Sequence, residues 1–172
     1  MPITLFHFNK NRAEKAEIPN SSGWWKSIES SDLDQDGDLD ILLGNEGLNT
    51  NLKASPNQPI ELYISDFDGN QANDPIMAYY KNGKQWVYPD LDLLAKQIAS
   101  VRKTYTDYES FAQKSFTEIF PSAYLEKSTS LKVEQLASAY LINKNGEYQF
   151  HLLADEAQWS CLQAFASDDF DK

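Results

Sequence analysis

The amino-acid sequence of 172 residues predicts a mainly β protein with an α-helical insertion, built from antiparallel sheets. Over most of the chain, apolar and polar residues alternate with the period of a β-strand. Asn82-Gly83 and Asn145-Gly146 each stand between two such runs, and this pair favours a tight hairpin because both residues accept a positive φ. Only residues 90–128 change to helical spacing, so we expect a single insertion there.

The first half of the chain predicts a series of β-strands. We expect them at residues 3–8, 13–18, 24–30, 40–44, 60–64, 75–80 and 85–88. Residues 45–58 carry Gly47, Pro56 and few aliphatic side chains, and therefore predict a loop. Trp24 and Trp25 are adjacent in the third expected strand, so their side chains should point to opposite faces of a sheet.

The insertion predicts three helices. Asp90 can cap the first, which should extend to about Tyr105. Thr106 and Glu109 have the spacing of a capping box and start a second helix, which Pro121 ends. A third, short helix is expected at residues 122–126. The aromatic residues of the region have helical spacing and predict a seam between the first two helices: Tyr105, Tyr108, Phe111, Phe116 and Phe120.

The order of elements repeats along the chain. Strand character returns at residues 131–142, and residues 148–153 complete a further hairpin. The Asn-Lys-Asn turn at residues 9–11 recurs at residues 143–145, followed each time by a Trp-containing stretch. An acidic loop that begins with an Asp-X-Asp triplet recurs along the chain, at residues 32–34, 66–68 and 169–171. The last copy stops within its loop, so we expect the chain to be a fragment of a longer repeat array.

The first acidic loop, residues 32–40, has the composition and spacing of a calcium-binding loop. Side-chain carboxylates stand at positions 1, 3, 5 and 9, which are Asp32, Asp34, Asp36 and Asp40. Asp38 would add its backbone carbonyl, and Gly37 permits a sharp turn around the ion. Calcium accepts about six to eight oxygen ligands in flexible geometry, whereas magnesium keeps more of its waters, so calcium is favoured.

Two other interpretations of this loop exist. An EF-hand begins in the same way, but it needs an acid at position 12 and flanking helices, whereas Leu43 stands there within an apolar, strand-like run. An acidic turn without a ligand is the second alternative. Five aspartates within nine residues repel one another unless a cation neutralises them, which favours the metal site.

The second acidic loop, residues 66–74, has oxygen donors at the same four positions. They are Asp66, Asp68, Asn70 and Asp74. Gln71 occupies position 6, where the first loop has Gly37, and so this site matches the pattern less well. The third triplet offers only Asp169 and Asp171, too few carboxylates to hold an ion within this chain.

The stretch Gly23-Trp24-Trp25-Lys26-Ser27-Ile28, followed by the first acidic loop and Ile41, resembles FG-GAP/VCBS-type repeats. Residues 66–75 and 169–171 look like further copies. Such repeats build the seven-bladed β-propeller of integrin α-subunit heads and of many secreted bacterial proteins. The resemblance implies antiparallel propeller-blade units whose acidic loops join two blade strands and bind Ca²⁺ through the residues given above.

The resemblance also implies a division of the chain into three segments. Residues 1–89 would be a β-propeller repeat segment with the calcium-binding loops, and residues 90–128 a helical insertion similar to that of a bacterial subgroup. Residues 129–172 would be the next repeat segment, truncated in its acidic loop.

Composition limits the function. The net charge of −11 repels phosphate backbones, which excludes nucleic acid as a partner, and no apolar run approaches the ~18 residues of a membrane span. The clustered carboxylates are better explained as metal ligands than as catalytic groups, so we expect no enzyme activity. We predict a calcium-binding module of a secreted or cell-surface protein, with its export signal outside this chain. The alternative is the scaffold part of a secreted enzyme that acts on carbohydrate or another polymer.

The expected partners follow from this class of protein. A structural or adhesive module would bind a protein or glycan surface ligand, with Ca²⁺ as its cofactor. A fragment of a repeat array exposes strand edges that neighbouring blades would cover. We therefore expect the isolated chain to self-associate through these blade edges.

Overall fold

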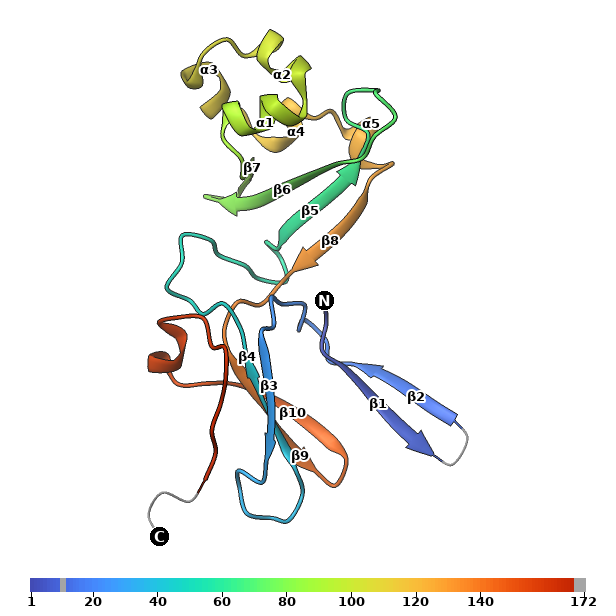
Figure 1. Ribbon diagram of the computed structural model, residues 1–172, viewed down its shortest axis with the longest axis vertical. Helices are drawn as coiled ribbons and strands as arrows, with labels where there is room; N and C mark the ends of the chain where they lie inside the picture. The colour runs from blue at the N-terminus through green and yellow to red at the C-terminus, as the bar shows by residue number, and fades with distance from the viewer. Residues whose placement is uncertain (10–11, 169–172) are drawn as a thin grey trace. The chain divides into compact units, whose positions relative to one another are not determined.

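The computed structural model describes residues 1–9 and 12–168 and shows a mainly β protein (Figure 1). The described strands form three antiparallel sheets, one of two strands and two of four strands. The α-helices of the described residues all lie between residues 91 and 125, so the mainly β fold with a helical insertion is confirmed. No closed barrel or propeller is formed by the described residues.

The chain forms two compact units. One unit contains residues 52–133, and the other contains residues 1–51 together with the segment from Glu134 onward. The 52–133 unit is therefore inserted in the sequence of the other unit, which we call the first unit.

The first unit contains the two-stranded sheet and one four-stranded sheet. Its strands are β1 (Thr4–Asn9), β2 (Arg12–Glu17), β3 (Ser27–Ser31), β4 (Asp40–Gly44), β9 (Ala139–Lys144) and β10 (Glu147–Leu152). β1 pairs with β2, and the larger sheet has the order β10-β9-β4-β3. The apolar run of β4 lies in the middle of this sheet, where Ile41 is opposite the fully buried Leu141.

Buried polar side chains join the two points at which the chain leaves and re-enters the first unit. The backbone N–H of Asn45 donates to the Ser138 hydroxyl at 3.0 Å, and the N–H of Ser138 donates to the Gln158 side-chain carbonyl at 2.8 Å. All three side chains are buried. Their hydrogen bonds satisfy backbone groups that would otherwise be costly to bury.

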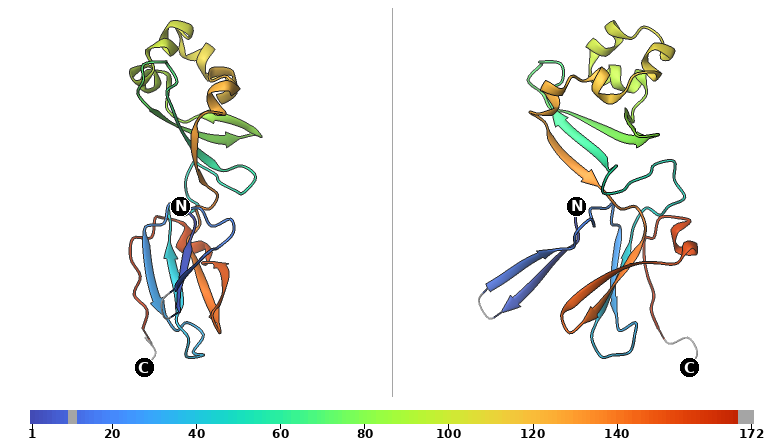
Figure 2. Two further views of the ribbon diagram at one scale, coloured as in Figure 1. Left: turned by 90° about the vertical axis from the view of Figure 1, so that its right-hand side faces the viewer. Right: turned by 180° about the vertical axis from the view of Figure 1, so that it is seen from behind.

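The inserted unit packs helices on a four-stranded sheet. Its strands are β5 (Ile60–Ser65), β6 (Asp74–Lys81), β7 (Lys84–Val87) and β8 (Thr129–Val133), in the order β7-β6-β5-β8. Its helices are α1 (Leu91–Gln97), α2 (Ala99–Thr104), α3 (Tyr108–Ala112), α4 (Phe116–Ile119) and α5 (Ser122–Leu125). Figures 1 and 2 show the helices gathered over one side of this sheet, where Ile76 and Leu94 lie in a common core.

Each of the two longer helices expected from the sequence is divided in two. Asp90 caps α1 as predicted, but Ile98 leaves the helical conformation with ψ of 90° and separates α1 from α2. Asp107, rather than Thr106, caps α3. A capping box at Ser115 and Glu118, which the sequence reasoning did not anticipate, starts α4. The hydroxyl and the N–H of Ser115 both donate to the Glu118 carboxylate, and these hydrogen bonds lower the pKa of Glu118 to about 2.

The aromatic residues predicted to form a helix–helix seam do so only in part, because two of the five pack elsewhere. The ring of Phe116 stacks on Tyr63 of β5 with centroids 4.7 Å apart, and Phe120 lies 4.8 Å from Phe67. Of the predicted seam, the contact between Tyr105 and Phe111 is present at 5.7 Å. Helical spacing identified the apolar face, whereas its partners are Tyr63 of the sheet and Phe67 of the loop that follows β5.

The tandem tryptophans precede a strand instead of lying within it. β3 begins at Ser27, so the expectation that Trp24 and Trp25 point to opposite faces of a strand is wrong. Both side chains are half-buried, and the indole N–H of Trp25 donates to the carbonyl of Ser21 at 2.9 Å. This hydrogen bond ties Trp25 to the backbone four residues earlier.

Candidate metal centres

The first acidic loop joins β3 to β4 and brings three carboxylates together. Asp32, Asp34 and Asp40 each place one oxygen so that the three atoms lie within 4.8 Å of one another. Asp40 is completely buried, whereas the other two side chains are exposed. The group therefore has one fixed member inside the sheet and two members that are open to solvent.

Asp40 is fixed because both of its oxygens accept backbone hydrogen bonds. Oδ2 accepts from the N–H of Leu33 at 2.8 Å, which closes the loop, and Oδ1 accepts from the N–H of Asn143 at 2.8 Å. Asn143 belongs to β9, about a hundred residues along the chain, and β9 pairs with β4 in the same sheet. The sheet thus positions the last carboxylate of the loop.

Asp32 shapes the first part of the loop. Its two oxygens accept from the N–H groups of Asp36, at 3.1 Å, and Gly37, at 3.0 Å. Gln35 and Gly37 have φ values of 61° and 96°, in the left-handed region. Glycine adopts this region without a steric penalty, whereas Gln35 needs the hydrogen bonds on either side to hold it there.

A lysine of the neighbouring hairpin contacts the loop. The ammonium of Lys144 pairs with Asp34 and with Asp36, the latter at 3.1 Å. The pKa of Asp36 lies below its usual range because the N–H of Asp38 and then Lys144 stabilise the carboxylate. The same two aspartates raise the pKa of Lys144. Lys144 therefore offsets part of the negative charge of the loop.

The second acidic loop joins β5 to β6 and repeats this arrangement. Asp66, Asp68 and Asp74 each contribute an oxygen to a group within 4.8 Å. Asp74 is buried and accepts from the N–H of Phe67 at 3.1 Å. Asp66 accepts from three backbone N–H groups, of which that of Gln71 at 2.9 Å contributes most to lowering its pKa.

The two loops share one hydrogen-bond pattern. In each, the N–H of position 2 donates to the acid at position 9, and the N–H groups of positions 5 and 6 donate to the acid at position 1. Positions 4 and 6 have positive φ in both loops, with glycine and glutamine exchanged: Gln35 and Gly37 in one, Gly69 and Gln71 in the other. Gln71, which departs from the sequence pattern, therefore adopts the same backbone region as Gly37.

Other residues considered from the sequence have different surroundings. Asp36 and Asp38 lie outside the group of three carboxylates, and the side-chain oxygen of Asn70 accepts from the N–H of Ala72 at 2.7 Å. The third triplet, with Asp169 and Asp171, lies outside the described residues.

The sequence reasoning missed Asn143 and Lys144 as partners of the first loop. The recurring Asn-Lys-Asn turn was the available signal, but a turn does not reveal which loop it contacts.

The chemistry of both groups suits a hard cation. Carboxylate oxygens are the ligands that calcium and magnesium prefer, and two ligands on opposite sides of one calcium ion are separated by about 4.6–5.2 Å. In both groups the three oxygens lie within 4.8 Å of one another, so one ion could contact all three. The two aspartate groups could therefore each hold a metal ion.

Comparisons with known proteins identify no relative of this chain. No protein-family model matches it, and neither a curated protein nor a solved structure is similar to it. Among the described residues, no helix has both the length and the apolar character needed to cross a membrane.

Proposed function

We propose that this chain is a calcium-binding β-repeat module of a secreted or cell-surface protein, with a structural and interaction role. The observation that carries the proposal is the repeated loop, in which the same nine-residue hydrogen-bond pattern gathers three carboxylates between the two strands of two different hairpins. One ion in each loop would link the two strands of its hairpin.

A bound cation would stabilise both loops in the same way. Three carboxylates within 4.8 Å repel one another, and the single ammonium of Lys144 reaches only the first loop among the described residues. An ion that binds only the folded chain adds RT ln(1 + [L]/Kd) to stability, which is ~2.7 kcal/mol at a hundredfold excess over Kd.

The calcium affinity bears on the proposed location. Extracellular modules bind calcium with Kd values of ~10⁻⁴–10⁻³ M. Such sites are saturated only where calcium reaches millimolar levels. Loops that are half open to solvent, with three clustered carboxylates each, fit this weaker class. A secreted or surface-exposed parent protein is therefore part of the proposal.

A propeller of the FG-GAP/VCBS type is the architecture we propose for the parent protein. The sheet β10-β9-β4-β3 supports it, because its four strands follow one another as a meander and the acidic loop joins the first two. The meander is interrupted between its second and third strands by the inserted unit. Such a sheet has the strand number and connection of a propeller blade.

Calorimetric titration of the chain with calcium chloride, up to about 5 mM, tests the proposal. We expect two ions to bind the unmutated chain and one ion to bind Asp34→Asn or Asp68→Asn, because each variant loses one clustered carboxylate. Asp38→Asn is the matched control, since it removes the same charge from the first loop but lies outside the cluster. It should still bind two ions.

Two results would contradict the calcium proposal. One is the absence of binding heat for the unmutated chain throughout the titration. The other is calcium binding with the same stoichiometry and affinity by Asp34→Asn and Asp38→Asn. That result would show that calcium binding depends only on the total charge of the loop. Magnesium chloride provides the metal control, and we expect weaker binding because magnesium loses its waters reluctantly.

A further inference from the structure

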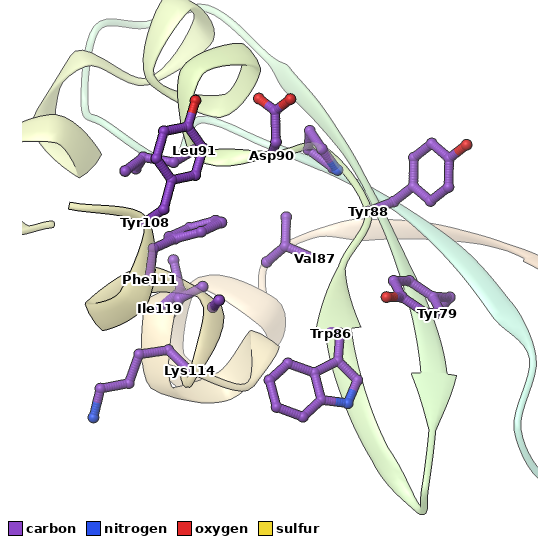
Figure 3. A pocket seen from close by; sticks show the side chains of 12 residues that line it. Tyr79, Trp86, Val87, Tyr88, Asp90, Leu91, Tyr108, Phe111, Lys114 and Ile119 are labelled. Carbon is purple, nitrogen blue, oxygen red and sulfur yellow. The ribbon is translucent and has the colours of Figure 1, made fainter.

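The inserted unit has a cavity of about 280 Å³ beside β7, lined by side chains of β6, β7 and the helices (Figure 3). Figure 3 shows Val87 between Phe111 and Ile119 on one side and Trp86 on the other. The cavity is mainly apolar and aromatic. Its volume lies at the lower limit of small-ligand sites, ~300–1,000 Å³, and suffices for one large side chain.

β7 adds main-chain hydrogen-bonding groups to the rim of this cavity. It lies at the edge of its sheet and, among the described residues, pairs with β6 alone. The N–H of Tyr88 donates to the carbonyl of Met77 in β6 at 2.8 Å, and residues of an antiparallel strand alternate between facing the partner and facing away. Gln85 and Val87 therefore direct their N–H and C=O groups away from β6. Such an edge is a template for another strand.

The two ends of β7 differ in charge. Lys81 and Lys84 flank the hairpin turn and take part in no ion pair of the described residues. Lys114 lines the cavity, and its Nζ is 3.4 Å from Oε1 of Glu118. At the other end, the exposed carboxylate of Asp90 lines the cavity. In a chain with net charge −11, a basic end of a groove favours a partner with an acidic residue there.

We propose that the groove between β7 and helices α3 and α4 binds an extended peptide segment, which adds to the sheet as an antiparallel strand beside β7. The peptide places an aromatic or large aliphatic side chain in the cavity and an acidic residue beside the lysines of the hairpin. The N–H and C=O groups of Gln85 and Val87, which point away from β6, select a peptide, because their spacing matches the main chain of a strand. This inference does not depend on calcium binding by the acidic loops.

Strand pairing gives the peptide a defined register. A residue opposite Val87 directs its side chain to the same face of the sheet, toward Phe111 and Ile119. An antiparallel partner then places its next residue opposite Trp86 and its third following residue opposite Lys84. An aromatic residue followed three positions later by an acid is therefore the predicted pattern.

The peptide Ac-Lys-Val-Phe-Val-Thr-Glu-NH₂ has this pattern and serves as the probe. We expect it to shift the backbone amide signals of residues 85–87 and the indole signal of Trp86 in NMR spectra of the full chain. Methylation of the peptide nitrogen at Phe should weaken binding about tenfold, because that N–H faces Val87. Methylation at the Val that follows should leave affinity within about twofold, because that N–H points to solvent.

A charge exchange tests the orientation of the peptide. Lys84→Glu should weaken binding of the probe by about fivefold, and a peptide with its terminal Lys and Glu exchanged should bind this variant better than the original probe does. Lys103→Glu on α2 is the matched control, since this exposed lysine lies outside the cavity lining, and it should bind the probe as the unmutated chain does.

The proposal is overturned by any of three results. The probe causes no shift at residues 85–87 up to about 1 mM, where even weak peptide binding would be seen. The two methylated peptides bind equally, which would mean that the cavity holds a side chain without strand pairing. Lys84→Glu and Lys103→Glu have the same effect, which would exclude the predicted orientation.

Discussion

Replacing Asp40 with asparagine removes the buried carboxylate that closes the first acidic loop. Asp40 is fully buried, and its two oxygens accept the N–H groups of Leu33 and Asn143, both at 2.8 Å. Asparagine has the same shape but only one acceptor oxygen. Its amide group would face the second N–H and leave it without a partner.

Two opposing terms set the size of this effect when calcium is removed by a chelator. Loss of one hydrogen bond to a charged acceptor costs about 1.5–3 kcal/mol, and an unsatisfied, partly buried donor adds to that cost. Removal of one charge relieves repulsion with Asp32 and Asp34, which is ~0.9 kcal/mol for each pair at 4.8 Å in water before screening by salt. Lys144 already offsets part of that repulsion. The net loss of stability is therefore about 1–2 kcal/mol, or ~2–8 °C in melting temperature.

Urea unfolding in the presence of a chelator measures this change in the free energy of unfolding. Amide hydrogen exchange of the folded chain is the second measurement. Asp38→Asn removes the same charge, but the Asp38 side chain accepts no hydrogen bond from the described residues, so this variant should be unchanged or slightly more stable. The Asp40 variant alone should lose exchange protection at the amides of Leu33 and Asn143. If Asp40→Asn is as stable as Asp38→Asn, the hydrogen bonds of Asp40 do not hold the loop and our reasoning fails.

Three further predictions concern the inserted unit. Phe116→Ala removes a fully buried ring that stacks on Tyr63, and should lower the free energy of unfolding by about 3–5 kcal/mol in urea; a loss under 1 kcal/mol would contradict the packing. Burial raises the pKa of Tyr63 to about 12, so this tyrosine should ionise late in an absorbance titration, and the stability that the neutral phenol contributes should fall between pH ~10 and 12. Tyr63→Phe should remove one tyrosine from the late step of that titration, and an unchanged late step would contradict the prediction. Asp107→Ala should cost about 1 kcal/mol by removing the cap of α3, and because the N–H of Ser110 lowers the pKa of Asp107, the cap should weaken in the unmutated chain as pH falls below ~4. A variant that matches the unmutated chain at both pH 7 and pH 3 would exclude this capping role.

Local chemistry could be predicted from the sequence with good accuracy. The hairpins at Asn82-Gly83 and Asn145-Gly146 form as expected, with positive φ at all four residues, because the turn depends only on those residues. The strands on either side of each acidic loop were also predicted. The spacing of aspartates indicated the three carboxylates that meet in the first loop, but it also included Asp36, which lies outside the group. Backbone conformation within a few residues is set by side-chain size and local hydrogen bonds, which a sequence displays directly.

The surroundings of the acidic loops could not be predicted in this way. Asn143 and Lys144 contact the first loop from more than a hundred positions away, through the pairing of β9 with β4. The entropic cost of closing a long loop increases only slowly with its length, so a residue can pair with a distant partner almost as readily as with a nearer one. The local sequence therefore does not indicate which distant residue becomes the partner.

The hairpins, the two aspartate loops and the amphipathic character of the helices depend on neighbouring residues and could be predicted. The interruption of one four-stranded sheet by residues 52–133, and the division of each long helix into two, depend on contacts between distant residues. The buried Ile98 and the ring of Phe116 lie in one core with residues of the sheet, and packing outweighs the small difference in free energy between a continuous and a broken helix. Long-range strand pairing and core packing join residues that are distant in sequence, and their energies therefore appear only in the folded chain.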